Sequence, residues 1–403
     1  MSFLRNLLDN MEKNWFGKGA KFERLYPLYE AADTLFYTPG KVTKGAAFVR
    51  DGADLKRVMI TVVVALMPAV IMALYNTGLQ ANLAIASGAG IPEGWRTAIV
   101  SGLGFDFSPD NIWACAVHGA VYFLPVFIVT FAVGLGWEVL FCIVRKEEVN
   151  EGFFVTGFLF PLIVPATIPL WQVALAISFG VVLGKEVFGG TGYNILNPAL
   201  ISRAFLFFGY PAQISGNEVW VAADGFTKAT PLADAFEFGM SSLTDKGDMW
   251  WDAFIGVIPG CMGETSTLAI LIGAVILLIT GVGSWRIMFS VTAGTILTAL
   301  LFNAVGSDTN PMMAMPFQWH LVLGGWALGA VFMATDPVTG AQTNTGRYIY
   351  GFLIGFLVVM VRCLNPAYPE GMMVSILLMN VFAPLIDYYV VQAHIKRRKA
   401  RYA

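Results

Sequence analysis

Apolar residues fall into ten separate runs along the chain, and most of these runs are long enough to cross a bilayer, which takes about 20 residues of helix. The third, fifth and eighth runs are too short for a simple crossing, and prolines interrupt the third. We expect half-helices or broken helices there, since only protein or a polar cavity can surround such backbone. The runs cover about 56–78, 114–144, 153–165, 169–188, 197–210, 267–283, 286–304, 319–334, 347–364 and 372–391. The sequence predicts an all-α polytopic membrane protein with about ten transmembrane spans.

A weak two-fold internal repeat is visible in the same pattern. Lys56-Arg-Val-Met-Ile precedes one apolar run, and Trp285-Arg-Ile-Met-Phe precedes another. Proline-interrupted segments also recur, with Asn197-Pro in the first half and Asp336-Pro, then Asn365-Pro, in the second. Paired broken segments in two halves indicate a site near the middle of the membrane.

The distribution of charge predicts the orientation of the chain. Only 13% of the 403 residues are charged, against about 25% in soluble domains. Ten of the 25 basic residues lie up to Arg57 and five more in 396–401, so both ends are expected in the cytoplasm. The loop 211–266 has two lysines, no arginine and eight acidic residues, and is therefore expected outside.

These boundaries divide the chain into five parts. They are a cytoplasmic N-terminal segment (1–55), a first membrane half (56–210), an outer, periplasmic loop (211–266), a second membrane half (267–391) and a basic cytoplasmic tail (392–403). The N-terminal segment lacks the apolar stretch of a cleaved signal peptide. The four cysteines and three histidines are scattered, and their spacing predicts no metal, haem or iron–sulfur site.

The outer loop contains a short polar segment, Asp224-Gly-Phe-Thr-Lys-Ala-Thr230. Its glycine allows a turn and a close approach of the backbone, and the small Ala229 leaves the Thr230 hydroxyl accessible. Asp224 could bind a metal ion or orient a phosphate donor. Because threonine is a poor nucleophile unless it is activated, another enzyme would have to install a phosphoester here. A polar turn without chemical function is the alternative interpretation.

This segment resembles the flavinylation motif of membrane flavoproteins in the sodium-pumping NADH:quinone oxidoreductase and its Rnf relatives. In that motif the last residue carries FMN through a phosphoester bond, which makes Thr230 the acceptor here. The resemblance covers nearly the whole chain and is closest to the family of B subunits of that oxidoreductase. It includes Gly136-Trp-Glu138-Val-Leu-Phe, Gly192-Tyr-Asn194-Ile-Leu-Asn197-Pro-Ala-Leu, the basic tail and the stretch 29–40.

The resemblance implies a translocase component in the inner membrane of a bacterium. Electrons would reach FMN on Thr230 from a partner protein, cross to a non-covalent riboflavin near the inner face and reduce ubiquinone, coupled to Na⁺ transport. The implied partners are the A, C, D, E and F subunits of a six-subunit respiratory complex and a flavin transferase. The sequence contains no nucleotide fingerprint of its own.

Glu138 is a candidate for the quinone site. A carboxylate within an apolar run is a functional candidate, but Arg145 and Lys146 follow about two helical turns later. A structural ion pair near the inner interface is therefore the alternative. The resemblance implies a quinone pocket at Gly134, Gly136, Glu138, Phe36, Tyr37 and Pro39.

Asn194 and Asn197 lie at the start of the fifth run, beside a glycine-rich turn. Asn-Pro is a common start of a helix, so capping alone would explain Asn197. Their amides could also bind the polar edge of a flavin, and the resemblance implies riboflavin near here.

Two carboxylates are candidates for the ion pathway. Asp336 stands among hydroxyls after a short apolar run, and hard cations such as Na⁺ prefer oxygen ligands. The resemblance links Asp387, at the end of the last run, to sodium uptake. A cap or an ion pair would also explain each of them. The charged residues Lys185, Glu186 and Arg203 could simply form ion pairs near the inner face.

Two other functions remain open from the sequence. Paired broken segments also fit a channel or transporter without flavin. A D subunit of the Rnf type would exchange electrons with ferredoxin-linked partners instead of quinone.

Overall fold

The structure is a computed structural model. It describes residues 2–17, 19–26, 29, 33, 55–88, 90–91, 93–147, 149, 152–214, 230–244, 249–307, 309–365 and 370–402. All elements in these ranges are helices or helical turns, which confirms the all-α prediction for the described part of the chain.

Within the described residues, six helical segments are long and apolar enough to cross a membrane, and three apolar helices are shorter. The long ones are α3 (Leu55–Ala86), α5 (Ile112–Arg145), α7 (Leu170–Gly184) with η3 (Glu186–Phe188), α13 (Trp285–Val305), α16 (Asn344–Leu364) and α17 (Met372–Tyr402). The shorter ones are α6 (Gly152–Leu162), α8 (Pro198–Gly209) and α12 (Thr267–Ile279).

The remaining elements lie at the two ends of the bundle or interrupt it. They are α1 (Ser2–Met11), η1 (Glu12–Phe16), η2 (Glu23–Leu25), α4 (Trp95–Gly102), η4 (Pro211–Gln213), α9 (Pro231–Phe238), α10 (Ser241–Thr244), α11 (Met249–Ile255), η6 (Pro311–Ala314), α14 (Phe317–Val322), α15 (Trp326–Leu328) and η7 (Gly329–Met333).

All ten predicted runs contain helix, and several differ in length from what a simple crossing requires. The third and fifth runs are the short helices α6 and α8, as predicted. The eighth is broken into α14, α15 and η7, also as predicted. The sixth was expected to be a full span, but α12 has 13 residues because it ends at Ile279, where Thr280 and Gly281, with φ 71°, turn the chain before the predicted end at 283. A mixture of complete and partial helices is therefore present.

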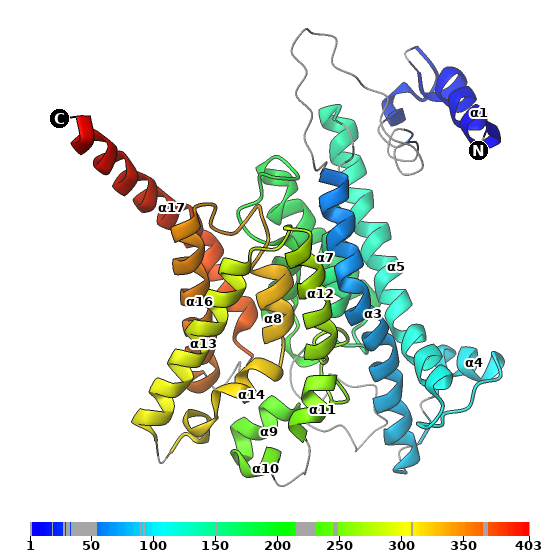
Figure 1. The fold of residues 1–403 in the computed structure, drawn as a ribbon. Coiled ribbons are helices and arrows are strands. Elements are labelled where there is room, and N and C mark those ends of the chain that lie inside the picture. Colours follow the sequence, from blue (N-terminus) through cyan, green and yellow to red (C-terminus); the bar gives the residue numbers. More distant parts are fainter. Residues whose placement is uncertain are drawn as a thin grey trace.

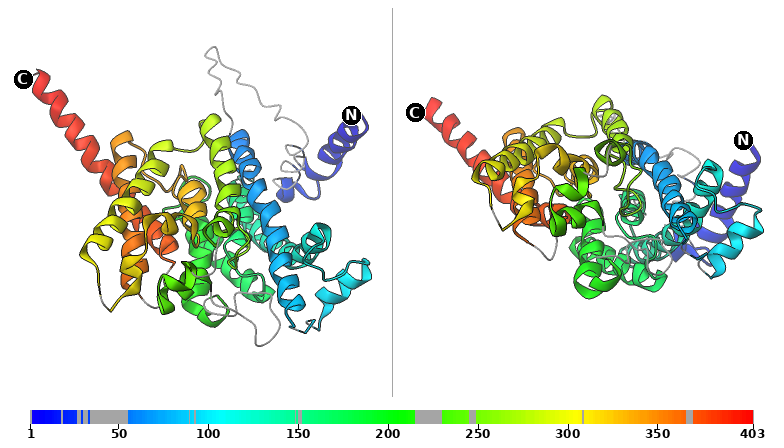
Figure 2. Two further views of the ribbon diagram at one scale, coloured as in Figure 1. Left: turned by 60° about the horizontal axis from the view of Figure 1, so that its bottom comes forward. Right: turned by 90° about the horizontal axis from the view of Figure 1, so that it is seen from below.

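Both termini lie at the same end of the helical bundle. Figure 1 shows α1, the start of α3 and the end of α17 at the top, and α9, α10 and α14 at the opposite end. Seen from below, α3, α4 and α5 lie on one side and the helices of the second half on the other (Figure 2). Helix α9, which follows Thr230 directly, is thus at the end opposite to both termini.

Two helix pairs approach so closely that only glycine fits between their backbones. A Cβ atom on Gly78 of α3 would lie 1.9 Å from the carbonyl oxygen of Cys115 on α5. A Cβ atom on Gly119 would lie 1.8 Å from the Leu74 carbonyl oxygen. The second half repeats this arrangement, since a Cβ atom on Gly355 of α16 would lie 2.1 Å from the carbonyl oxygen of Val291 on α13. Small residues are the usual means of close helix packing in membranes.

We expect Gly119→Ala to destabilise the protein by about 1–3 kcal/mol, because overpacking forces the two backbones apart. Gly136→Ala on the same helix is the control, since a Cβ atom there would have no neighbour within 4 Å among the described residues. Thermal unfolding in detergent measures both variants. Equal melting temperatures for the two would contradict the packing argument.

Candidate functional site

A cavity of about 80 Å³ is lined by residues of both membrane halves, including Val58 and Met59 near the start of α3. We call it the inner cavity. Its polar lining comes from Thr156, Lys185, Thr191, Asn194, Asn197, Thr335 and Asp336. Its apolar lining includes Val58, Met59, Val62, Val155, Leu159, Leu277 and Phe332.

Asn197 joins the two halves at this cavity. Its Oδ1 accepts hydrogen bonds from the backbone N–H groups of Ala199 and Leu200, at 3.1 and 3.3 Å, and so caps α8. Its Nδ2 donates to Oδ2 of Asp336 at 3.2 Å. The predicted cap is confirmed, and the same amide lines the cavity. The two interpretations of Asn197 therefore do not exclude one another.

Asp336 lies in the same cavity as the two asparagines, although the sequence suggested a separate ion pathway. Its carboxylate accepts hydrogen bonds from Asn197, from the Val338 N–H at 3.0 Å and from the Thr339 hydroxyl at 3.1 Å. These bonds stabilise the turn after η7. An ion that binds the Asp336 carboxylate would have to replace these hydrogen bonds.

Asn194 is buried and lines the cavity from the loop before α8. Its Nδ2 donates to the Leu196 carbonyl at 3.2 Å. The preceding glycines, Gly189, Gly190 and Gly192, all have φ values between 91° and 125°, which other residues rarely adopt. The glycine-rich turn therefore directs the chain back to the cavity.

Glu138 forms a buried ion pair with Lys185, which itself lines the inner cavity. The sequence suggested Arg145 or Lys146 as its partner, and the structure corrects this. Arg145 pairs with Glu186 instead, with a distance of 2.8 Å between Nη1 and Oε2. Helix α5 ends there, because Lys146 adopts φ 60°. The ion pair brings the quinone candidate Glu138 close to the flavin candidates.

The two glycines predicted for the quinone pocket lie in different surroundings. A Cβ atom on Gly134 would lie 2.1 Å from Cζ of Phe153, so this glycine makes room for an aromatic ring. Gly136 is exposed. Gly134 and Glu138 are buried on one face of α5 and Gly136 is not. Phe36, Tyr37 and Pro39 lie outside the described residues.

Asp387 fixes the loop that leads into α16. Its carboxylate accepts hydrogen bonds from the Gln342 N–H at 2.6 Å, the Thr343 N–H at 3.0 Å and the Thr343 hydroxyl. Asp336 and Asp387 therefore hold the two ends of one loop, residues 336–343.

Thr230 lies immediately before Pro231, the first residue of α9. Its carbonyl oxygen accepts a hydrogen bond from the Asp234 N–H at 2.9 Å, and the residue is half-buried. Leu232, in the first turn of α9, is buried in a cluster with Leu323 and Cys363. Asp224 and Ala229 lie outside the described residues. The attachment of a flavin to Thr230 remains a prediction.

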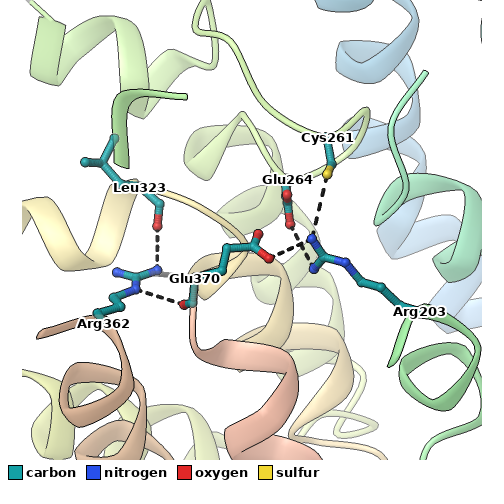
Figure 3. A network of polar contacts seen from close by, with 6 residues as sticks. All are labelled: Arg203, Cys261, Glu264, Leu323, Arg362 and Glu370. Atoms are coloured by element: carbon teal, nitrogen blue, oxygen red, sulfur yellow. Dashed lines mark hydrogen bonds and ion pairs between the residues drawn. The ribbon is translucent and has the colours of Figure 1, made fainter. Parts of the chain in front are cut away.

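The sequence did not predict a second polar cluster, which lies around Arg203 (Figure 3). The suggestion that Arg203 forms its ion pair near the inner face is wrong, since Glu186 pairs with Arg145 and Lys185 with Glu138. Nη2 of Arg203 lies 2.6 Å from Oε2 of Glu370, and its Nη1 lies 3.8 Å from Oε2 of Glu264. A sequence signal for these glutamates existed. Glu264 follows the glycine-rich stretch 260–263, and Glu370 lies within the proline- and glycine-rich stretch 366–371.

Comparison with known proteins decides the family. The NQR2, RnfD, RnfE family matches residues 42–396, which is most of the chain. The chain belongs to this family. The resemblance found in the sequence is thereby confirmed.

Members of the NQR2, RnfD, RnfE family with high identity cover the whole chain. The B subunit of the Na(+)-translocating NADH-quinone reductase of Chromohalobacter salexigens is 60% identical over 398 residues, which is 99% of this chain and 96% of that protein. The subunit of the same name from Ectopseudomonas mendocina is 60% identical over 402 residues, 99% of both chains. That of Pseudomonas aeruginosa is 57% identical over the same length and share. The N-terminal segment is therefore common to this chain and these members.

Proposed function

We propose that this chain is the membrane-embedded B subunit of a Na⁺-translocating NADH:quinone reductase. It carries FMN covalently on Thr230 and riboflavin non-covalently in the inner cavity, and it passes electrons to ubiquinone. The observation that carries the proposal is 60% identity over 99% of the chain to proteins of that name. The Asp224–Thr230 segment supports the covalent flavin.

The residues of the inner cavity fit a flavin ring. The amides of Asn194 and Asn197 can exchange hydrogen bonds with its pyrimidine edge, and apolar side chains such as Phe332 and Leu159 can cover its dimethylbenzene edge. The cavity of about 80 Å³ has room for several water molecules, so a flavin enters only when the walls move. Met59 is a flexible side chain in that wall. A bound flavin supplies one- and two-electron transfer at this position.

The Glu138–Lys185 pair places the quinone candidate next to the cavity. Lys185 reaches the cavity, and Glu138 lies behind it on the buried face of α5. The ammonium group can hold negative charge on a reduced ring, and the carboxylate keeps that ammonium in place. Riboflavin and quinone sites would then be neighbours at the inner face.

Na⁺ transport is proposed to use the loop 336–343. Asp336 and Asp387 stabilise its two ends through hydrogen bonds to the backbone and to hydroxyls. A cation that takes over these carboxylate oxygens releases the bonds and frees the loop. This links ion binding to a movement beside the inner cavity.

The orientation follows from charge and from the shape of the bundle. Both termini lie at one end, where basic residues are concentrated, and α9 lies at the other. We place the termini in the cytoplasm and Thr230 at the periplasmic face of a bacterial inner membrane, with about ten crossings or partial crossings. Partners are the A, C, D, E and F subunits, a flavin transferase for maturation, ubiquinone and Na⁺.

Flavin analysis of the purified complex tests the proposal. We expect denaturation to release one riboflavin per copy of this chain and to leave one FMN attached to it. Asn197→Leu should reduce the released riboflavin at least tenfold without affecting the attached FMN. The control is Asn303→Leu, which removes an amide bonded to the Met315 carbonyl, away from the cavity.

Other results would favour another function. A native complex without any flavin would support a channel or transporter instead. Electron exchange with ferredoxin but not with quinone would support a D subunit of the Rnf type. Loss of riboflavin in Asn303→Leu as well would contradict the assignment of riboflavin to the inner cavity.

A further inference from the structure

A network of charged groups, all buried except the partly exposed Glu370, extends from Arg203 of α8 to Arg362 of α16 (Figure 3). It consists of Arg203, Glu264, Glu370 and Arg362, with Cys261 beside Arg203. Arg362 has no exposed surface at all. Buried ion pairs contribute little net stability, and charges at membrane depth usually serve a function.

Helix α8 connects this network to the inner cavity. Asn197 caps the helix and contacts Asp336 in the cavity. Arg203 follows six residues later, about 9 Å further along the helix axis. Because α8 has only 12 residues, a shift of its first turn also moves Arg203.

Arg362 connects the network to the outer segment. Its guanidinium donates to the carbonyl oxygens of His320 at 2.7 Å, Leu323 at 2.8 Å and Glu370 at 3.0 Å. Gly324, with φ +64°, lies between Arg362 and α9, since a Cβ atom there would be 3.2 Å from Nη2 of Arg362 and 3.3 Å from Cδ2 of Leu232. Leu232 is two residues from Thr230. The contacts thus lead to the start of α9.

Arg203 has two carboxylate partners and uses them unequally. It is hydrogen-bonded to Glu370 at 2.6 Å, whereas Oε2 of Glu264 is buried, 3.8 Å from Nη1, and has no hydrogen-bond partner among the described residues. Both carboxylates lie against Gly325, where a Cβ atom would be 2.4 Å from Oε2 of Glu264 and 3.5 Å from Oε1 of Glu370. Both carboxylates thus lie within reach of the same guanidinium.

We propose that Arg203 is a positioning residue that couples the two flavin sites, an inference that rests on the proposed function. In the arrangement that the structure shows, Arg203 binds Glu370 and stabilises the contacts of Arg362 with the outer segment. When α8 shifts, Arg203 moves to Glu264 and the surroundings of the FMN on Thr230 change. Coupling between two sites requires such an element with two arrangements, and it acts in both directions.

Redox titration of the FMN on Thr230, in the purified complex, tests this coupling. We expect Asn197→Leu, which loses the inner flavin, to change the equilibrium constant for one-electron reduction of that FMN about tenfold. This corresponds to a shift of about 59 mV in its reduction potential. In a Glu264→Gln background the same replacement of Asn197 should change this constant less than twofold. In an Arg203→Lys background the replacement of Asn197 should likewise change this constant less than twofold, because lysine lacks the forked guanidinium that can bond two carboxylates. The unaltered chain, Asn197→Leu, Glu264→Gln and the double variant form a double-mutant cycle.

The control is Thr295→Val, which removes a buried hydrogen bond between Trp326 and Thr295 at 2.9 Å. It should leave the tenfold effect intact. An undiminished effect in Glu264→Gln would overturn the proposal, and so would an equal loss of the effect in Thr295→Val. Glu264→Gln tests the proposal even if Arg203→Lys fails to assemble, since Glu264→Gln keeps the hydrogen bond between Arg203 and Glu370. If the unaltered chain carries no flavin on Thr230, the proposed function itself fails.

Discussion

Thr230→Ala is expected to abolish the covalent flavin of this chain, so that no fluorescent band remains on a denaturing gel. The proposed bond is a phosphoester to the Thr230 hydroxyl, which alanine lacks. Thr230→Ser keeps a hydroxyl at the same place and should retain flavin. NADH-dependent quinone reduction by the complex should fall at least a hundredfold in the alanine variant, because electrons would lose their carrier at the outer face. Intact mass after denaturation measures the adduct directly.

Thr227→Ala provides the matched control. It removes a hydroxyl from the same segment, three residues earlier, and should keep both flavin and activity. Flavin that persists in Thr230→Ala, or that disappears equally in Thr227→Ala, would show that Thr230 is not the acceptor. The non-covalent flavin in the inner cavity should be present in all of these variants.

Lys185→Met is expected to have the largest effect on stability. It leaves Glu138 as an unpaired carboxylate that is only 2% exposed. Breaking a buried ion pair costs about 3–5 kcal/mol, and replacing both charges is often neutral. We therefore expect a lower melting temperature for Lys185→Met and recovery in Glu138→Gln/Lys185→Met. Quinone reduction should stay low in the double variant if these groups act on the quinone.

Asp9→Asn is the control for this prediction. It breaks the ion pair between Arg5 and Asp9, whose side chains are 41% and 42% exposed, and such pairs contribute about 0–1 kcal/mol. A double variant with normal stability and normal quinone reduction would mean that the Glu138–Lys185 pair is purely structural. Equal destabilisation in Asp9→Asn and Lys185→Met would contradict the argument from burial.

The positions of the helices could be predicted because the bilayer sets their length and composition. Even the interruptions at 153–165 and 319–334 were visible, since they shorten an apolar run. The shortness of α12 was not visible. The run 267–283 was interpreted as one helix, but the helix ends at Ile279, and hydrophobicity alone does not separate the turn that follows from the helix before it.

The partners of the buried charges could not be predicted from the sequence. Asn197 and Asp336 were separate candidates. They are 139 residues apart in the sequence, but the fold brings them within hydrogen-bonding distance. Arg203 and Glu370 are 167 residues apart. Each charge has several possible partners of the right sign, and only the three-dimensional packing of the broken segments selects one. Local spacing favoured Arg145 or Lys146 as the partner of Glu138, but the partner is Lys185, which lies between α7 and η3.

The glycine contacts of α3 with α5, and of α13 with α16, have a consequence for how such a protein can combine two kinds of transport. Helices whose backbones touch cannot slide past one another, so these pairs form a rigid frame. An electron moving between fixed cofactors needs a constant separation, and a frame of this kind maintains it. An ion needs a path that opens and closes, and the short helices and loops between the pairs are free to provide it. Rigidity for the electron and movement for the ion are thus assigned to different parts of one chain.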